Sequence, residues 1–192
     1  MNSQHRLRNA LKLFLVAIVA SVSFSACGSG GNGNVLYYLA LGDSLSVGVQ
    51  QDPATGQSVE TDEGYADQIF AALQAEFPNL QLVKFGCPGE TTTTMVNGGL
   101  CDDYETGSQL GDALEFLVAN QENVLLVTID IGANDVLDSD CLSLPDPAQV
   151  QACFEALFPQ IASNLSLISS GLFSASDGVF PVIGMTFYNP LL

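Results

Sequence analysis

The sequence predicts a three-layer α/β/α domain, in which helices cover both faces of a mainly parallel β-sheet. Two observations predict this class. Apolar runs typical of buried strands alternate with segments whose apolar residues recur at helical spacing, which is the pattern of βαβ units. In addition, three short polar motifs that contain glycine each follow a predicted strand directly. Parallel sheets gather their functional residues at such carboxyl ends of strands.

The first predicted strand covers residues 35–41, a compact apolar run that ends at Gly42. Residues 66–77 then carry apolar side chains at helical spacing and are stopped by Pro78, so we expect a helix there. Residues 80–85 are expected to form the second strand. These three elements make one strand–helix–strand unit.

The second half of the domain repeats this alternation. Residues 112–118 are helical in pattern, and residues 123–131 are the clearest strand in the chain. A long helix is predicted from Pro147 to Ile168. A fourth strand is predicted for residues 179–187, although a proline near its beginning leaves the start open, since proline cannot donate to a sheet ladder.

The N-terminus has the layout of a secretory signal, because Arg6, Arg8 and Lys12 form a basic n-region, the apolar run at residues 11–20 continues it, and small residues follow. Cys27 follows Phe24-Ser-Ala26 directly and resembles the lipobox cysteine of bacterial lipoproteins, which is acylated after cleavage. We therefore expect a signal peptide over residues 1–27 and a glycine-rich tether over residues 28–34, followed by the domain, residues 35–192. The alternative is an ordinary cleaved signal that leaves Cys27 as a free thiol. A membrane-spanning helix is not expected, because the run is shorter than the ~20 residues that a bilayer requires.

The charge of the domain is strongly one-sided. The sequence holds 21 acidic residues against four Lys and Arg, and all four except Lys84 lie at or before Lys12. Such a surface repels phosphate backbones and anionic lipid headgroups, so a nucleic-acid partner is not expected. The negative charge serves first to keep an exported protein soluble.

Four cysteines remain after Cys27, and an even number in an exported domain predicts two disulfides. The sequence allows three pairings. We favour Cys87–Cys101 and Cys141–Cys153, because each bridge then closes one local excursion between regular elements. A metal site is the rival interpretation, but no paired C-x-x-C and no nearby histidine supports it, so no metal is expected.

Taken singly, the three strand-end motifs carry little information. Ser44, after Gly42 and Asp43, could be an ordinary helix N-cap. Asn134 and Asp135 alone would indicate a turn. Gly89 alone would be a loop glycine with positive φ. Their combination is far more specific.

In combination, the motifs resemble the GDSL (SGNH) family of serine ester hydrolases, in its bacterial secreted or lipoprotein form. Tyr38-Leu-Ala-Leu-Gly-Asp-Ser-Leu45 resembles the first conserved block of that family, Gly86-Cys-Pro-Gly-Glu-Thr91 its second, and Ile129-Asp-Ile-Gly-Ala-Asn-Asp135 its G-x-N-D block. Gly64-Tyr-Ala-Asp67 between them is also similar. The blocks occur in family order, and the resemblance runs from Val35 to the end of the chain. It implies the SGNH fold, which has a flavodoxin-like sheet.

The resemblance also implies roles for individual residues. Ser44 corresponds to the nucleophile that attacks an ester carbonyl. The backbone N–H groups of Ser44 and Gly89 and the side-chain amide of Asn134 correspond to the oxyanion hole, which stabilises the charge of the tetrahedral intermediate. Asp43 and Asp135 are expected to brace these turns by hydrogen bonds. No cofactor is implied, and the Cys87–Cys101 bridge would pin the loop that carries Gly89.

The family takes its catalytic base from a D-x-x-H block near the C-terminus, and this sequence contains none. Its one histidine, His5, lies in the targeting segment, and Lys84 lies inside a predicted strand. Residues 179–192 would end as an apolar edge strand without cover. We therefore expect a C-terminally truncated fragment that lacks the last strand and helix of the domain and is inactive, rather than a natural pseudoenzyme.

Three functions remain in competition after the sequence analysis. The leading one is a monomeric, exported ester hydrolase, active on a small-molecule ester and held at the bacterial membrane only through a lipid anchor. The alternative is a noncatalytic surface-anchored binding module that keeps the pocket for carboxylate or acyl groups. A third is an acidic cation-binding domain built on Asp43 and Asp135, but hard cations need several converging oxygens. The sequence leaves open whether the ester belongs to a lipid, an acetylated sugar or a simple ester.

Overall fold

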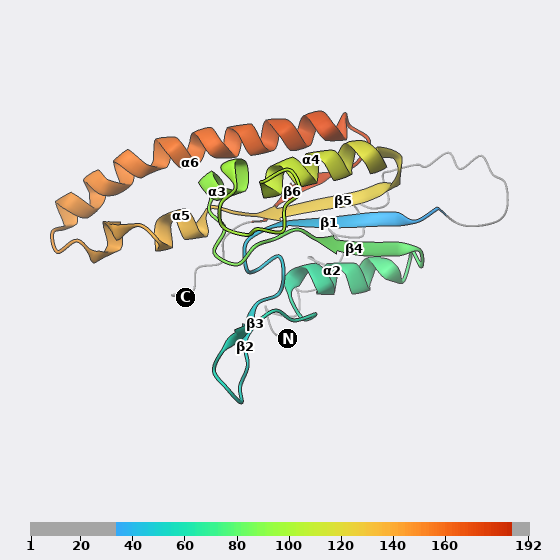
Figure 1. Ribbon diagram of the computed structural model, residues 1–192, viewed down its shortest axis with the longest axis horizontal. Helices are drawn as coiled ribbons and strands as arrows, with labels where there is room; N and C mark the ends of the chain where they lie inside the picture. The colour runs from blue at the N-terminus through green and yellow to red at the C-terminus, as the bar shows by residue number, and fades with distance from the viewer. Residues whose placement is uncertain (1–33, 186–192) are drawn as a thin grey trace, which may run out of the picture. The chain divides into compact units, whose positions relative to one another are not determined.

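The computed structural model describes residues 34–185, and these form the α/β architecture that the sequence predicts (Figure 1). Four parallel strands build the sheet, in the spatial order β4-β1-β5-β6. In chain order these strands are β1 (Leu36–Gly42), β4 (Leu80–Lys84), β5 (Val124–Asp130) and β6 (Val182–Gly184). The predicted signal peptide, Cys27 and residues 28–33 of the tether lie outside the described residues, as does the end of the strand predicted for residues 179–187.

Helices cover both faces of the sheet, so the predicted three-layer arrangement is confirmed (Figure 1). One face packs against α3 (Thr92–Asn97), α4 (Gln109–Asn120) and α6 (Pro147–Ser176), and the other packs against α2 (Tyr65–Gln74). None of these helices is long and apolar enough to cross a membrane, a statement that covers the described residues only.

Strand β1 is central and buried on both faces, which explains why its sequence is a continuous apolar run. Successive side chains of a strand point to opposite faces. Leu39 and Leu41 therefore enter the core beneath α4 and α6, whereas Tyr38 and Ala40 enter the core beneath α2. All four side chains are fully buried.

Several predicted elements differ in length from those observed, among them α4, predicted for residues 112–118, and most of all α6 and β6. Helix α6 begins with Pro147 at its N-terminus, as expected, but it continues past Ile168 to Ser176 and ends where Asp177 adopts a left-handed conformation. Strand β6 is short and starts just after Pro181. The proline contributes no N–H, and its carbonyl accepts a 3.0 Å bond from the backbone N–H of Val127.

Several small elements carry no strong sequence pattern and were not predicted. They are the hairpin of β2 (Gln50–Gln51) and β3 (Ser58–Val59), helix α3, helix α5 (Ala133–Leu137), and the 3-10 turns η1 (Gln121–Asn123) and η2 (Asp140–Ser143). Helix α3 follows the second polar motif and α5 begins within the third, so both lie beside the candidate site.

Lys84 fastens α2 to the edge strand β4. Its ammonium lies 2.6 Å from a carboxylate oxygen of Asp67 on α2 and donates to the carbonyl of Thr61 at 3.2 Å. A second acidic neighbour, Asp62, lies at 3.9 Å but is fully exposed, so that pair contributes little. The lysine is largely buried, with 18% of its side chain exposed.

Candidate active site

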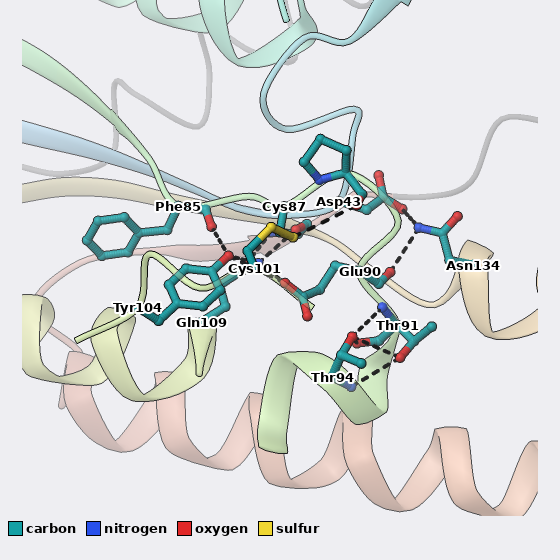
Figure 2. Close-up of a disulfide and its surroundings, with 12 residues drawn as sticks. Asp43, Phe85, Cys87, Glu90, Thr91, Thr94, Cys101, Tyr104, Gln109 and Asn134 are labelled. Atoms are coloured by element: carbon teal, nitrogen blue, oxygen red, sulfur yellow. Dashed lines mark hydrogen bonds between the residues drawn. A yellow bond between two sulfur atoms is a disulfide. The ribbon is translucent and has the colours of Figure 1, made fainter. Parts of the chain in front are cut away.

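The three polar motifs meet at the carboxyl ends of β1, β4 and β5. The side-chain amide of Asn134, at the start of α5, donates to a carboxylate oxygen of Asp43 at 3.2 Å and to the carbonyl of Glu90 at 2.9 Å (Figure 2). Asp43 follows β1, Glu90 follows β4, and Asn134 follows β5. One side chain thus joins all three strand ends.

The turn after β1 carries Ser44. Gly42 ends the strand with a φ of +126°, and a Cβ at this position would overlap the carbonyl oxygen of Asp130, so only glycine fits. The Asp43 carboxylate accepts the N–H of Leu45 at 3.0 Å, while its backbone carbonyl accepts both the N–H and the hydroxyl of Ser46. No α-helix begins at Ser44, which lies half-buried in this turn and is therefore not a helix cap.

The loop after β4 folds into a tight turn over residues 87–90. The N–H of Glu90 donates to the carbonyl of Cys87 at 3.0 Å, with Pro88 and Gly89 between them. The φ of Gly89 is +85°, as a type II turn requires of its third residue. A type II turn uses the N–H of its fourth residue and leaves that of the third without a partner inside the turn.

The N–H groups of Ser44 and Gly89 donate no hydrogen bond to any described residue, whereas those around them do. Asp43 and Leu45, on either side of Ser44, donate at 3.2 Å and 3.0 Å. Cys87 and Glu90, which flank the Pro88-Gly89 pair, donate at 3.1 Å and 3.0 Å. Unpaired backbone N–H groups at the end of a sheet are available to an anionic oxygen.

Asn134 and Asp135 both have partners in the structure. Asn134 uses its amide for the two bonds described above, so its N–H groups are engaged rather than free. Asp135 accepts the backbone N–H of Thr92 at 2.7 Å and its hydroxyl at 2.5 Å, which ties the start of α3 to α5. These contacts join the second motif to the third.

Asp130, at the end of β5, was not singled out by the sequence analysis. It is 5% exposed, one carboxyl oxygen accepts the hydroxyl of Tyr65 at 2.8 Å, and the other has no partner among the described residues. Burial raises the pKa of Asp130 to about 8, and the nearby carboxyl of Asp43 contributes to this shift. Burial likewise raises the pKa of Tyr38 to about 12 and that of Tyr65 in the same direction.

A second buried acid lies behind the turn that carries Gly89. Glu90 is 1% exposed, and its carboxyl accepts from the Gln109 amide at 3.0 Å and lies 3.4 Å from the Tyr104 hydroxyl. Burial raises the pKa of Glu90 above its ordinary value. Burial also raises the pKa of Tyr104, whose hydroxyl donates to the carbonyl of Phe85 at 2.7 Å.

The structure contains disulfides between Cys87 and Cys101 and between Cys141 and Cys153, which is the pairing that the sequence analysis favoured. The first bridge starts at Cys87, in the turn of residues 87–90, and links this turn to Cys101 in the loop that follows α3 (Figure 2). The second joins η2 to the first turns of α6, away from the three strand ends.

The described residues contain no histidine, because the one histidine of the sequence is His5. They therefore bring together a candidate nucleophile and oxyanion donors without an imidazole base. That the sequence is a truncated fragment stays a prediction.

An open groove of about 1340 Å³ begins beside the turn at Gly86 and Pro88 and runs along the outer edge of β4. Its lining is rich in carboxylates, with Lys84 as its basic residue; the acids are Glu60, Asp62, Asp67, Asp103 and Asp112. The groove therefore favours neutral or cationic molecules over anionic ones.

Residues 40–184 match the profile of the GDSL-like Lipase/Acylhydrolase family. No curated protein sequence matches the chain.

Two similar solved structures are an extracellular lipase from Streptomyces rimosus and phospholipase A1 from Streptomyces albidoflavus NA297. The lipase is 20% identical with a TM-score of 0.52, and the phospholipase is 20% identical with a TM-score of 0.51. In both cases the match covers 81% of this chain and 62% of the other, so the chain spans less than two thirds of either protein. At this identity the likeness concerns the fold.

Proposed function

Because the chain belongs to the GDSL-like Lipase/Acylhydrolase family, we propose that it is a serine ester hydrolase in which Ser44 is the nucleophile. The Ser44 hydroxyl attacks the ester carbonyl and loses its proton to a base, and the carbonyl oxygen becomes an oxyanion. Collapse of this tetrahedral intermediate expels the alcohol, which takes up a proton. Water then releases the acid from the acyl-serine.

The observation that carries the proposal is the pair of unpaired N–H groups at Ser44 and Gly89. A developing oxyanion needs donors that are already in place, and removal of one such donor costs about 10²–10³ in rate. Asn134 supplies the third donor in the proposal. It does so by sharing or redirecting one of the N–H groups that now bond Asp43 and Glu90.

The base in this family is the histidine of a D-x-x-H block, which residues 34–185 do not contain. The proposal therefore assigns the nucleophile and the oxyanion donors to the described residues and no base. Asp43 and Asp135 act in it as braces, through their bonds to Leu45, Asn134 and Thr92.

The proposed substrate is a neutral small-molecule ester, since carboxylates line the groove that adjoins the turn at Pro88, a groove that Ser44, Gly89 and Asn134 do not themselves line. The proposed location is outside the cytoplasm, because the two disulfides form in an oxidising compartment. Acylation of Cys27 would hold the monomeric domain at the membrane, and the lipobox-like sequence before that cysteine supports this part of the proposal.

Chemical rescue tests the proposal directly. The exported protein and its Ser44→Ala variant are compared for p-nitrophenyl acetate hydrolysis over a series of imidazole concentrations, since imidazole can replace a missing histidine base. The variant corrects for hydrolysis by imidazole itself. We expect background rates without imidazole and a saturable, Ser44-dependent rise with it, together with fluorophosphonate attachment at Ser44 by mass spectrometry.

Equal rates and equal labelling in the two proteins would refute the hydrolase proposal and leave the noncatalytic binding module. A second pair of variants examines the oxyanion hole. Gly89→Ala should lower the rescued rate because its φ of +85° strains any side chain. Gly56→Ala, at a loop glycine with a φ of +69° and open space around it, is the matched control.

A further inference from the structure

We propose that Gln109 is a positioning residue of this site, which fixes the spacing between the N–H groups of Ser44 and Gly89. The inference rests on the proposed hydrolase function, because only a reaction that forms an oxyanion uses that spacing. Gln109 is the first residue of α4 and is fully buried. It touches neither N–H group and acts through the residues beside them.

The first contact of Gln109 is a paired hydrogen bond to Gly42. Its carbonyl oxygen accepts the Gly42 N–H at 2.6 Å, and its Nε2 donates to the Gly42 carbonyl at 2.9 Å. The primary amide of Gln109 thus pairs with both backbone groups of Gly42, as a neighbouring strand pairs with the residue opposite. Ser44 follows Gly42 by two residues, so this pair holds the base of the nucleophile turn.

The second contact of Gln109 is with the turn that carries Gly89. Its Nε2 donates to the carboxyl of Glu90 at 3.0 Å and lies 3.1 Å from the hydroxyl of Tyr104 (Figure 2). Glu90 follows Gly89 directly, and its backbone carbonyl accepts the amide of Asn134. One buried side chain therefore joins the strand that leads to Ser44 to the turn that presents Gly89.

This arrangement exceeds what filling a core requires. An apolar residue of similar size would fill the space, but it would leave buried polar groups of Gly42 and Glu90 without Gln109 as partner. The loop that supports Gln109 is closed by the Cys87–Cys101 bridge and by the Tyr104 bond to Phe85. We call the contacts of Gln109 with Gly42 and Glu90 the clamp. The clamp is thus anchored on the same loop that carries Gly89.

The test compares Gln109→Met, which keeps the shape and loses the hydrogen bonds, with Gln121→Met. Gln121, the residue directly after α4, is the control, and its amide donates to the carbonyls of Ala175 and Ser176 at 3.0 Å and 3.4 Å. Two quantities are measured in each protein. They are the rate of Ser44 labelling by a fluorophosphonate in the presence of imidazole, and the ¹H–¹⁵N resonances of Ser44 and Gly89.

We expect Gln109→Met to lower the labelling rate about tenfold or more, because a misplacement on the order of 1 Å can cost as much as 10²-fold in rate. The Ser44 and Gly89 resonances should shift with it. Gln121→Met should destabilise the protein less, because Gln121 is only partly buried, and should leave both the rate and these resonances unchanged. A merely structural role for Gln109 predicts the same behaviour for both variants, and that result would overturn the proposal.

Gln109→Glu decides the matter if the methionine variant does not fold. A protonated glutamic acid can accept from Gly42 and donate to its carbonyl, whereas an ionised one cannot donate and faces the carboxyl of Glu90. The Ser44 and Gly89 resonances of this variant should return toward those of the wild type as the pH falls. Resonances that stay displaced at every pH, or never leave the wild-type positions, would count against the clamp.

The two proposals can fail separately. Absence of labelling in the wild-type protein would contradict the hydrolase function. The resonances of Ser44 and Gly89 do not depend on labelling, so they would still show whether Gln109 positions them.

Discussion

The Tyr65 hydroxyl donates a 2.8 Å hydrogen bond to one carboxyl oxygen of Asp130, whose other oxygen has no partner among the described residues. This unpaired oxygen is buried, and the nearby Asp43 carboxyl adds to the rise in the pKa of Asp130 that burial causes. A proton on Asp130 would serve that second oxygen. With its pKa raised to about 8, Asp130 favours the protonated, neutral form below that pH, beside the turn that carries Ser44.

Replacement of Asp130 by asparagine should change how stability depends on pH. The pKa of Asp130 is raised to about 8 in the folded protein, so between its ordinary value and 8 the folded state holds a proton that the unfolded state lacks. Raising the pH through this range then weakens folding, by up to about 1.4 kcal/mol per pH unit for one proton. An asparagine side chain carries no such proton. Its carbonyl oxygen can accept from the Tyr65 hydroxyl, and its NH₂ group can donate to the Asp43 carboxyl.

The measurement is urea denaturation of the wild type and of Asp130→Asn between about pH 5 and pH 9. The unfolding free energy of the variant should increase relative to that of the wild type as the pH rises, and this difference should level off above the raised pKa of Asp130. The titratable groups around Asp130 are Asp43, Tyr65 and Tyr38, all unchanged in the variant. Asp138→Asn removes an exposed acid as a control, and curves that run parallel for all three proteins would contradict the prediction.

Loss of the Asp135 carboxylate should detach α3 from the site. Asp135→Ala leaves the Thr92 N–H and hydroxyl without their acceptor, which should cost about 1–3 kcal/mol of unfolding free energy. Chemical denaturation measures this loss. Asp138→Ala changes an exposed acid at the C-terminal end of α5 and should cost much less unfolding free energy. Equal losses in the two variants would show that the contact of Asp135 with Thr92 does not stabilise the fold.

The two disulfides should have similar effects on stability and different effects on the site. Their sequence separations are 14 and 12, so removal of either should cost roughly 3 kcal/mol by the loop-entropy estimate. Only the Cys87–Cys101 pair lies in the loop that presents Gly89. Replacing that pair by serine should slow fluorophosphonate labelling of Ser44, whereas replacing the Cys141–Cys153 pair should leave it unchanged in native conditions.

Gly42→Ala should be much more damaging than a substitution at an ordinary loop glycine. Gly56→Ala, at a φ of +69° with no neighbour within 4 Å, should cost about 1–2 kcal/mol for the left-handed conformation alone. At Gly42 the added methyl group also meets the carbonyl of Asp130. Thermal melting should show that Gly42→Ala loses at least twice as much unfolding free energy as Gly56→Ala. Similar losses in the two variants would mean that β1 and β5 move apart easily.

The long elements could be predicted because their patterns are strong over many residues. The apolar run of β1 and the strand β5 appear at the predicted places within one or two residues. Gly89 adopts a positive φ of +85°, which both a plain loop glycine and an oxyanion donor would allow, so its role stays a prediction. Helix α3 was missed because its threonines favour strands, and it is held by mutual bonds between Thr91 and Thr94 and by burial of Met95.

The polar support of the site could not be predicted for a different reason. Gln109 bonds to Gly42 across 67 positions of the sequence, and no local pattern marks such a contact. Asp130 resembles any polar residue at the end of a strand until its burial is known. The contact between Gln109 and Gly42 and the burial of Asp130 can be identified only once the packing of α4 and α2 against the sheet is known.

The place of Lys84 has a consequence for how proteases meet this domain. Trypsin cleaves after lysine and arginine, and Lys84 is the one such residue in the described part of the chain. The bond after it joins the last residue of β4 to Phe85, whose N–H donates to the Ala40 carbonyl of β1. Tryptic cleavage within residues 34–185 must therefore wait until the sheet opens, so a digestion time course would report its unfolding.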